Sequence, residues 1–314
     1  MVHCMAQMDM AAAAPIPRRV LVIYNPAAGR RRRKRLSAVL DRLAARGCAV
    51  TTRETRGRGD AEEFARQVAA GECDVLVAAG GDGTVNEVIN GMMARPDRPM
   101  LAVIPLGTAN VLACEIGLDP QDPEQIAETI ATAGSRTVHL GIANGRHFLL
   151  MAGAGLDAHV VEGVNTHGAL KRRTGKFAYV VEGLRQALGY DFPALKIRAD
   201  GQVYEGRMAV ACKGRHYGGP FVAAPEAKLE RPSLEVCILP NKGVAGMLRY
   251  GLALPLGKLA DLPEVRVVSA QSITILGPRG APVQADGDIV ARLPAEITVA
   301  AETLDLLVPN ELTL

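Results

Sequence analysis

The chain has 314 residues, enough for two domains with well-buried cores, and its formal net charge of +3 is too small to favour a nucleic-acid partner by itself. It has no tryptophan and few other aromatic residues, which argues against a surface on which single-stranded bases stack. No apolar stretch approaches the length of a membrane span, and scattered cysteines without a C-x-x-C pair favour reduced thiols in a cytoplasmic protein.

The chain begins with residues 1–17, which are rich in alanine and methionine, and the first pair of arginines follows them. A signal peptide places its basic residues before its apolar region, so this order predicts a disordered leader. Beyond the leader, short β-branched runs alternate with amphipathic runs as far as residue 133, which predicts a doubly wound α/β domain. Strands are predicted over 20–24, 74–79 and 100–104, and helices over 32–46, 60–70, 85–91 (closed by Gly91) and 123–133.

After Thr137 the pattern changes to short strand-like segments separated by turn residues, which predicts a mainly antiparallel second domain, a β-sandwich. Strands are predicted over 148–152, 195–199, 202–212, 234–239, 265–270, 272–276, 282–285 and 304–308, with helices over 169–189 and 243–261.

A glycine-rich turn, Gly80 to Thr84, lies between the strand 74–79 and the helix 85–91. Its glycines let the backbone approach a phosphate, and the helix N-terminus turns free N–H groups toward it. The turn lacks the lysine of a P-loop and is not a G-x-G-x-x-G sequence. Asp82 would repel a phosphate, so it is useful there only if Mg²⁺ lies between them or if it handles a proton. The alternative is a tight turn whose glycines merely fit the bend.

Two further loops follow predicted strands: residues 25–29 after the strand 20–24, and residues 105–110 after the strand 100–104. In an open parallel sheet, ligands bind outside the carboxyl ends of the strands. The three loops are therefore predicted to line one crevice.

In this order and spacing, NPAAG, GGDGTVNEVING and PLGTAN resemble the diacylglycerol kinase catalytic family, which includes bacterial soluble lipid kinases and sphingosine kinases. The resemblance continues through residues 152–158, 175–179, 214–219 and 286–288. It implies a Rossmann-like nucleotide domain over 18–138, to which residues 302–314 return, and a β-rich lipid-substrate domain over 139–301. It also implies ATP and Mg²⁺ as cofactors and a membrane lipid as substrate, without naming the lipid.

The resemblance assigns one set of residues to the nucleotide. The set comprises Asn25, Pro26, Ala27, Ala28, Gly29, Thr55, Gly80, Gly81, Asp82, Gly83, Thr84, Val85, Asn86 and Thr108. Within it, Thr84 and Asn86 are expected to donate side-chain hydrogen bonds to phosphates. Asp82 is expected to hold Mg²⁺, directly or through water. Asp288 is expected to be the catalytic base, where the family's D-G-E motif has a glutamate.

Three positions depart from the family pattern. Val111 and His139 stand where the family often has aspartates, and Arg231 stands in the loop that carries D-G at the family's structural metal. Because arginine cannot ligate Mg²⁺, that metal site is predicted to be empty. These departures leave open a catalytically weak nucleotide- or lipid-binding regulator. An NAD-kinase-like enzyme is a second alternative, since NAD kinases carry a related glycine loop.

The strongest charge feature is the uninterrupted basic run Arg30–Arg35 at the predicted start of a helix, where cations oppose the helix dipole. One interpretation is attraction to anionic lipid headgroups, at about 1 kcal/mol per base near the surface. The other is a solvated helix end. The attraction to lipid headgroups predicts a cytoplasmic protein that associates peripherally with membranes. The sequence also leaves open whether the protein forms a homodimer.

Overall fold

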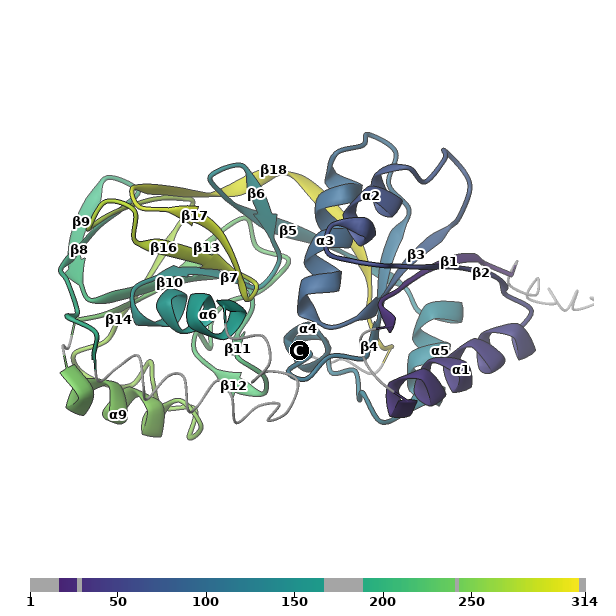
Figure 1. Ribbon diagram of the computed structural model, residues 1–314, viewed down its shortest axis with the longest axis horizontal. Coiled ribbons are helices and arrows are strands. Elements are labelled where there is room, and N and C mark those ends of the chain that lie inside the picture. The colour runs from purple at the N-terminus through teal and green to yellow at the C-terminus, as the bar shows by residue number, and fades with distance from the viewer. Residues whose placement is uncertain (1–16, 27–29, 167–188, 241–242, 311–314) are drawn as a thin grey trace, which may run out of the picture.

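The computed structural model describes residues 17–26, 30–166, 189–240 and 243–310. It confirms the predicted fold class, an α/β domain joined to a mainly antiparallel β-sandwich (Figure 1). The predicted leader and the helix predicted over 169–189 lie almost entirely outside these ranges. In the ranges described, no helix combines the length and apolar composition needed to span a membrane.

The first domain is built on parallel strands in the order β2-β1-β3-β4, with α1 and α5 on one face of the sheet and α2 and α3 on the other (Figure 1). Its elements are β1 (Arg19–Tyr24), α1 (Arg30–Ala45), β2 (Ala49–Glu54), α2 (Asp60–Arg66), β3 (Val75–Gly80), α3 (Asp82–Met93), β4 (Met100–Pro105), α4 (Val111–Glu115) and α5 (Pro123–Thr132). Helices on both faces bury the central strands, which explains their unbroken apolar sequences.

The prediction that Gly91 ends its helix is wrong, because α3 continues to Met93. A Cβ at Gly91 would collide with the carbonyl oxygen of Glu62 on α2. This glycine therefore allows α2 and α3 to approach closely and does not stop the helix.

The second domain consists of two facing sheets. Its elements are β5 (Ser135–Ala143), β6 (Arg146–Phe148), β7 (Met151–Ala154), α6 (Leu156–Thr166), β8 (Leu195–Ala199), β9 (Gln202–Gly206), β10 (Met208–Cys212), β11 (His216–Tyr217), β12 (Phe221–Val222), β13 (Leu234–Leu239), α9 (Gly243–Ala253), β14 (Arg266–Ala270), β15 (Ser272–Leu276), β16 (Pro282–Ala285), β17 (Asp288–Arg292) and β18 (Ala295–Leu307). One sheet has the order β14-β13-β10-β7-β16-β17, and β18-β15-β8-β9 faces it. Alternate side chains such as Leu195, Ile197 and Ala199 fill the space between the sheets, as expected of a sandwich.

Several predicted elements are shorter than the sequence suggested. The helix predicted over 60–70 ends at Arg66. The strand predicted over 148–152 is interrupted by Leu149 and Leu150, and the one predicted over 202–212 is interrupted by Arg207. The helix predicted over 243–261 ends at Ala253, two residues before Pro255, which lacks the N–H that a continuing helix needs.

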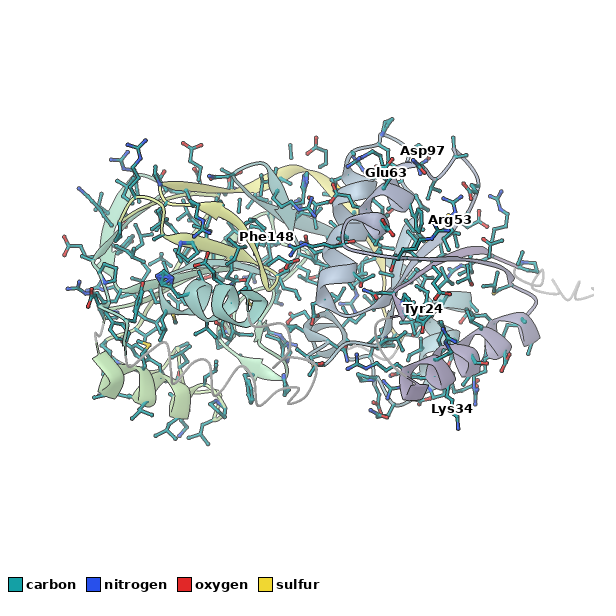
Figure 2. All side chains as sticks on the ribbon, viewed as in Figure 1. Tyr24, Lys34, Arg53, Glu63, Asp97 and Phe148 are labelled. Atoms are coloured by element: carbon teal, nitrogen blue, oxygen red, sulfur yellow. The ribbon has the colours of Figure 1, made fainter. Side chains whose placement is uncertain are left out.

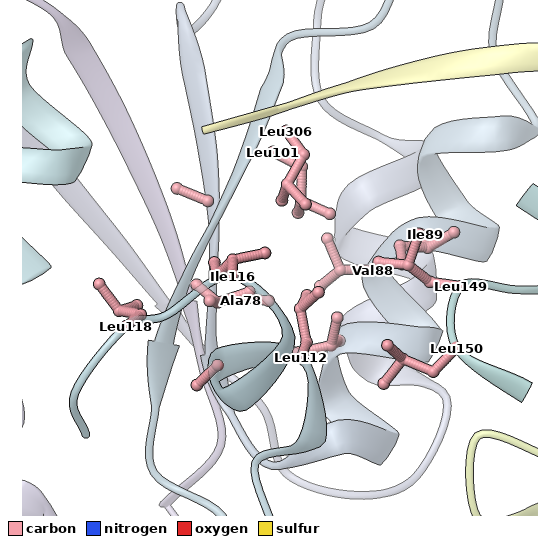
Figure 3. Packing of buried hydrophobic residues seen from close by; sticks show 14 of the residues in the cluster. Ala78, Val88, Ile89, Leu101, Leu112, Ile116, Leu118, Leu149, Leu150 and Leu306 are labelled. Atoms are coloured by element: carbon pink, nitrogen blue, oxygen red, sulfur yellow. The ribbon is translucent and has the colours of Figure 1, made fainter. Parts of the chain in front are cut away.

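The long strand β18 belongs to both domains. It pairs with β15 and β5 in antiparallel fashion, and Leu306 near its end pairs in parallel with Leu101 of β4. Figure 1 shows this yellow strand passing from one domain to the other, and Figure 3 shows Leu306 beside Leu101 in the core. One strand thus joins the sheets of the two domains.

Candidate active site

The glycine-rich turn after β3 and the loop after β4 lie with their backbones in contact. A Cβ at Gly107 would lie 2.5 Å from the Cα of Gly81 and 2.6 Å from the Oδ1 of Asn110. The same Asn110 oxygen accepts the N–H of Gly107 at 2.6 Å. Any side chain at position 107 would overlap Gly81, so glycine is required there for the backbones of the two loops to approach so closely.

The loop after β1 lies at the same end of the sheet, beyond the carboxyl ends of the parallel strands. The Nδ2 of Asn25 donates to the Oγ1 of Thr84 at 3.2 Å, and its backbone N–H donates to Ala79 at 3.0 Å. Pro26 follows Asn25, while residues 27–29 lie outside the described ranges. Thr55 is buried at the end of the neighbouring β2. The structure therefore brings Asn25 and Thr84 together, two residues that the sequence placed at the nucleotide.

Part of the basic run also reaches these loops. Arg32 donates to the Oγ1 of Thr108 at 3.3 Å, and Arg35 contacts the carbonyl oxygen of Pro105 at 3.4 Å. Arg33 and Lys34 are exposed, and Lys34 points away from the body of the protein (Figure 2). The run thus has a side that holds the loop after β4 and a side that faces outward.

Asp82 lies half-buried at the start of α3, with its carboxylate turned toward the start of α4. Its Oδ1 accepts the backbone N–H of Val111 at 2.7 Å. Burial raises the pKa of Asp82, while hydrogen bonds from the N–H groups of Val111, Leu112 and Asn110 act in the opposite direction. The Oδ1 of Asp82 can keep these bonds while the carboxylate still offers free lone pairs. Contact with Mg²⁺, directly or through water, therefore stays a prediction.

Asn86 lies at the interface between the domains, where its side-chain amide already has partners. Its buried Nδ2 donates to the carbonyl oxygen of His147 at 3.0 Å and to the Oδ2 of Asp286 at 3.2 Å. The expected hydrogen bond from Asn86 to a phosphate would require these bonds to break, and it stays a prediction.

Sequence reasoning missed the role of Asp286, although its D-G motif had been singled out. The carboxylate accepts the N–H groups of Leu149 at 2.8 Å, Leu150 at 3.0 Å and Met151 at 3.0 Å. Burial raises the pKa of Asp286, and these N–H groups oppose the shift. Asp286 thus fixes the turn before β17 against the start of β7, and so fixes where Asp288 lies.

Asp288 approaches the glycine-rich turn from the second domain. A Cβ at Gly83 would lie 3.7 Å from its Oδ2, and the guanidinium of Arg58 lies 3.1 Å from its Oδ1. A cleft of about 340 Å³ lies here, lined by Arg58, Gly59, Glu62, Asn86, Glu87, Arg146, Asp288, Ile289 and Val290. The expected base therefore lines a cleft between the domains, and its carboxylate lies near Gly83 of the expected phosphate turn.

A second contact between the domains, also missed from the sequence, lies at the end of α4. The Oε2 of the buried Glu115 lies 2.6 Å from the Nδ1 of His216 and accepts its backbone N–H at 2.9 Å. Burial raises the pKa of Glu115, but the hydrogen bonds from His216 and Arg215 outweigh it and the net direction is downward. This contact ties the G-R-H-Y-G-G segment to the helix that Asp82 holds. Across the described residues, no three His, Cys, Asp or Glu side chains converge as metal ligands.

Comparison with known proteins matches both halves of the chain to family models. Residues 19–143 match the diacylglycerol kinase catalytic domain, and residues 151–308 match the YegS C-terminal NAD kinase beta sandwich-like domain. The chain is 28% identical to a diacylglycerol kinase of Bacillus subtilis (strain 168), over 94% of this chain and 97% of that one. It is 30% identical to a diacylglycerol kinase of Staphylococcus aureus (strain bovine RF122 / ET3-1), over 94% of each.

Solved structures agree with these matches. A crystal structure from Bacillus anthracis str. Sterne, described as a candidate diacylglycerol kinase, superposes with a TM-score of 0.79 at 26% identity. The superposition covers 95% of this chain and 98% of that one. A second structure of such a protein from the same strain gives a TM-score of 0.75 at 25% identity, over 92% of this chain and 97% of that one.

Proposed function

Because the chain belongs to the diacylglycerol kinase family, we propose that it is a lipid kinase that transfers the γ-phosphate of ATP to the hydroxyl of a lipid such as diacylglycerol. The observation that carries the proposal is the position of Asp288, whose Oδ2 would lie 3.7 Å from a Cβ at Gly83. A carboxylate that can accept a proton thus faces the turn suited to phosphates.

In this mechanism the N–H groups of the turn 80–84 and of the start of α3 bind the nucleotide phosphates. Asp82 acts by holding the loop after β4 against the turn, through its bond to Val111. Asp82 would hold Mg²⁺ directly or through water, and the metal would supply charge neutralisation on the phosphates. Asp288 would accept the proton of the lipid hydroxyl as the hydroxyl oxygen attacks the γ-phosphorus, and ADP would leave with the electron pair of the broken P–O bond. Arg58 would offset the repulsion between this carboxylate and the phosphates.

The lipid substrate lies in a membrane, so the enzyme needs a surface that meets one. The outward side of the basic run, Arg33 and Lys34, supports contact with anionic lipid headgroups. The inward side, Arg32 and Arg35, holds the loop after β4. We therefore divide the run into a membrane-facing pair and a loop-facing pair.

Labelled ATP offered with a panel of lipids and with NAD tests the proposal. We expect label in a lipid when Mg²⁺ is present, and none with the Asp288→Ala variant. Label in NAD would instead favour an NAD-kinase-like enzyme. Retained ATP binding with no transfer to any acceptor would favour a nucleotide-binding regulator.

A further inference from the structure

Lys213 is a lysine with no solvent exposure in the second domain, directly after β10. Its Nζ donates to three main-chain carbonyl oxygens of one loop: those of Lys228 at 3.0 Å, Arg231 at 2.5 Å and Ser233 at 3.3 Å. A buried charge is costly unless its hydrogen bonds are satisfied, and an ammonium has three N–H donors. The loop therefore supplies one acceptor for each donor.

A pKa of about 8 for Lys213 favours the charged ammonium at neutral pH. Burial lowers the pKa of Lys213 to about 8, and the carboxylates of Glu230 and Glu235 raise it. Convergent carbonyl oxygens from one loop are also ligands that proteins use for a hard metal cation. In this chain the side-chain ammonium of Lys213 already occupies the centre of that arrangement.

The surroundings of the loop fit a lysine better than a metal ion. The backbone N–H of His139 on β5 donates to the carbonyl oxygen of Leu229 at 2.9 Å, so β5 holds the loop from the other side. The Nδ1 of His139 is buried and makes no hydrogen bond in the described structure. Burial lowers the pKa of His139, and the charge of Lys213 lowers it further. A neutral imidazole beside an ammonium avoids adding a second charge, whereas a metal ion at this point would favour a carboxylate.

We propose that the ammonium of Lys213 is the structural cation of the loop 228–233, so that this loop needs no metal ion. The family resemblance implies a structural metal here, and the departure at Arg231 predicted an empty site. The structure instead points to an internal replacement. The inference concerns the stability of the second domain and stands whether or not the proposed kinase activity is correct.

The first test measures the melting temperature of the purified full-length protein without nucleotide, in EDTA and in Mg²⁺, Ca²⁺ or Mn²⁺. We expect the wild type to melt within about 1 °C in all four, because a cation that does not bind the folded state cannot stabilise it. Lys213→Met should lower the melting temperature by at least about 5 °C, since three buried carbonyl groups lose their donors. Lys196→Met, on the exposed side of β8, is the matched control and should melt like the wild type.

The second test recreates a metal site. Lys213→Ala combined with His139→Asp opens the space among the carbonyls and adds a carboxylate beside it. We expect Ca²⁺ or Mn²⁺ to raise the melting temperature of this double variant by several degrees, and EDTA to reverse the rise. The single variant Lys213→Ala should respond less.

Three results would overturn the proposal. One is a fall in the wild-type melting temperature in EDTA, or one equivalent of divalent metal retained by the purified wild type. Another is a Lys213→Met variant as stable as the wild type. The third is a double variant that no cation stabilises, because the carbonyls would then not form a cation site. Should Lys213→Met fail to fold, the wild-type metal content and the double variant still decide the question.

Discussion

The Oδ1 of Asp82 and the backbone N of Val111 are 2.7 Å apart, and this hydrogen bond joins the turn after β3 to the loop after β4. Val111 stands where the family often has an acidic residue, yet it contributes here through its main chain. The catalytic role proposed for Asp82 can therefore be separated from its structural contact by substitution.

Asp82→Asn keeps the shape of the side chain and one oxygen that can accept the N–H of Val111. We expect transfer to fall at least ~100-fold, a rise of about 2.7 kcal/mol or more in the barrier, because the charge is lost. Circular dichroism should show a persisting fold, and steady-state kinetics would measure the loss. Near-normal turnover would exclude a catalytic role for the charge of Asp82.

Asp288→Ala should abolish transfer while ATP binding survives, because a base acts on the acceptor and not on the nucleotide. Calorimetric ATP titration beside a phosphoryl-transfer assay would separate the two effects. Asp288→Glu restores the residue of the family motif and should support turnover at least equal to the wild type. An Ala variant with an unchanged rate would show that the base lies elsewhere.

Gly107→Ala should lower the free energy of unfolding by about 1–3 kcal/mol, because the new methyl group would overlap the backbone of Gly81. Gly57→Ala is the matched control, since a Cβ there meets nothing within 4 Å and the expected change is within about 0.5 kcal/mol. Urea unfolding of both variants checks the difference. Equal stability would mean that the two loops do not cross as described.

The variants Arg33→Gln/Lys34→Gln and Arg32→Gln/Arg35→Gln should behave differently. Loss of the outward pair should weaken sedimentation with anionic vesicles and raise the KM for lipid in vesicles. It should leave kcat on a short-chain soluble lipid largely intact. Loss of the inward pair should lower turnover on both substrates, since the loop after β4 loses its support. Unchanged sedimentation of the first variant would identify the run as a solvated helix end.

Asp157 predicts a pH dependence of stability. It is buried in the first turn of α6, its Oδ2 lies 3.2 Å from the Nε2 of Gln284, and burial raises its pKa from 3.8 to about 6. The folded state thus favours the protonated carboxyl group of Asp157. This preference contributes up to about 3 kcal/mol to the free energy of unfolding. The contribution is full below about pH 4 and is lost as the pH rises through about 6.

Asp157→Asn should therefore stabilise the protein at pH 7 and flatten the dependence between pH 4 and 6. Urea unfolding at a series of pH values measures this, with the exposed Asp41→Asn as control. A variant that keeps the wild-type pH profile would show that another group titrates in this range.

Local pattern was enough to predict β1, β3 and β4, because a strand buried on both faces is apolar throughout, but it missed the edge strand β2, which is polar and mostly exposed. The pattern also predicted that the loops after these strands lie together beyond the carboxyl ends of the strands. The contacts of Asn25 with Thr84 and of Gly81 with Gly107 illustrate this. The contacts between the domains have no such pattern in the sequence. Asp286 meets residues more than a hundred positions away, and no periodicity records such a contact.

Lys213 did leave a signal in the sequence. A lysine at the end of the apolar run Met208–Cys212 needs partners when it is buried. The sequence could not identify them, because main-chain carbonyl groups are the same for every residue type.

The position of β18 constrains the order in which the chain can fold during synthesis. Without this strand, β4 has β3 on one side and an unpaired edge on the other, although Leu101, Ala102 and Ile104 on β4 are buried in the finished protein. Unpaired apolar edges are sites of aggregation. The nascent nucleotide domain must keep that edge open until the residues around Leu306 leave the ribosome. A fragment cut after residue 143 would keep the whole match to the diacylglycerol kinase catalytic domain, yet it would lack Asp288 and be prone to aggregate.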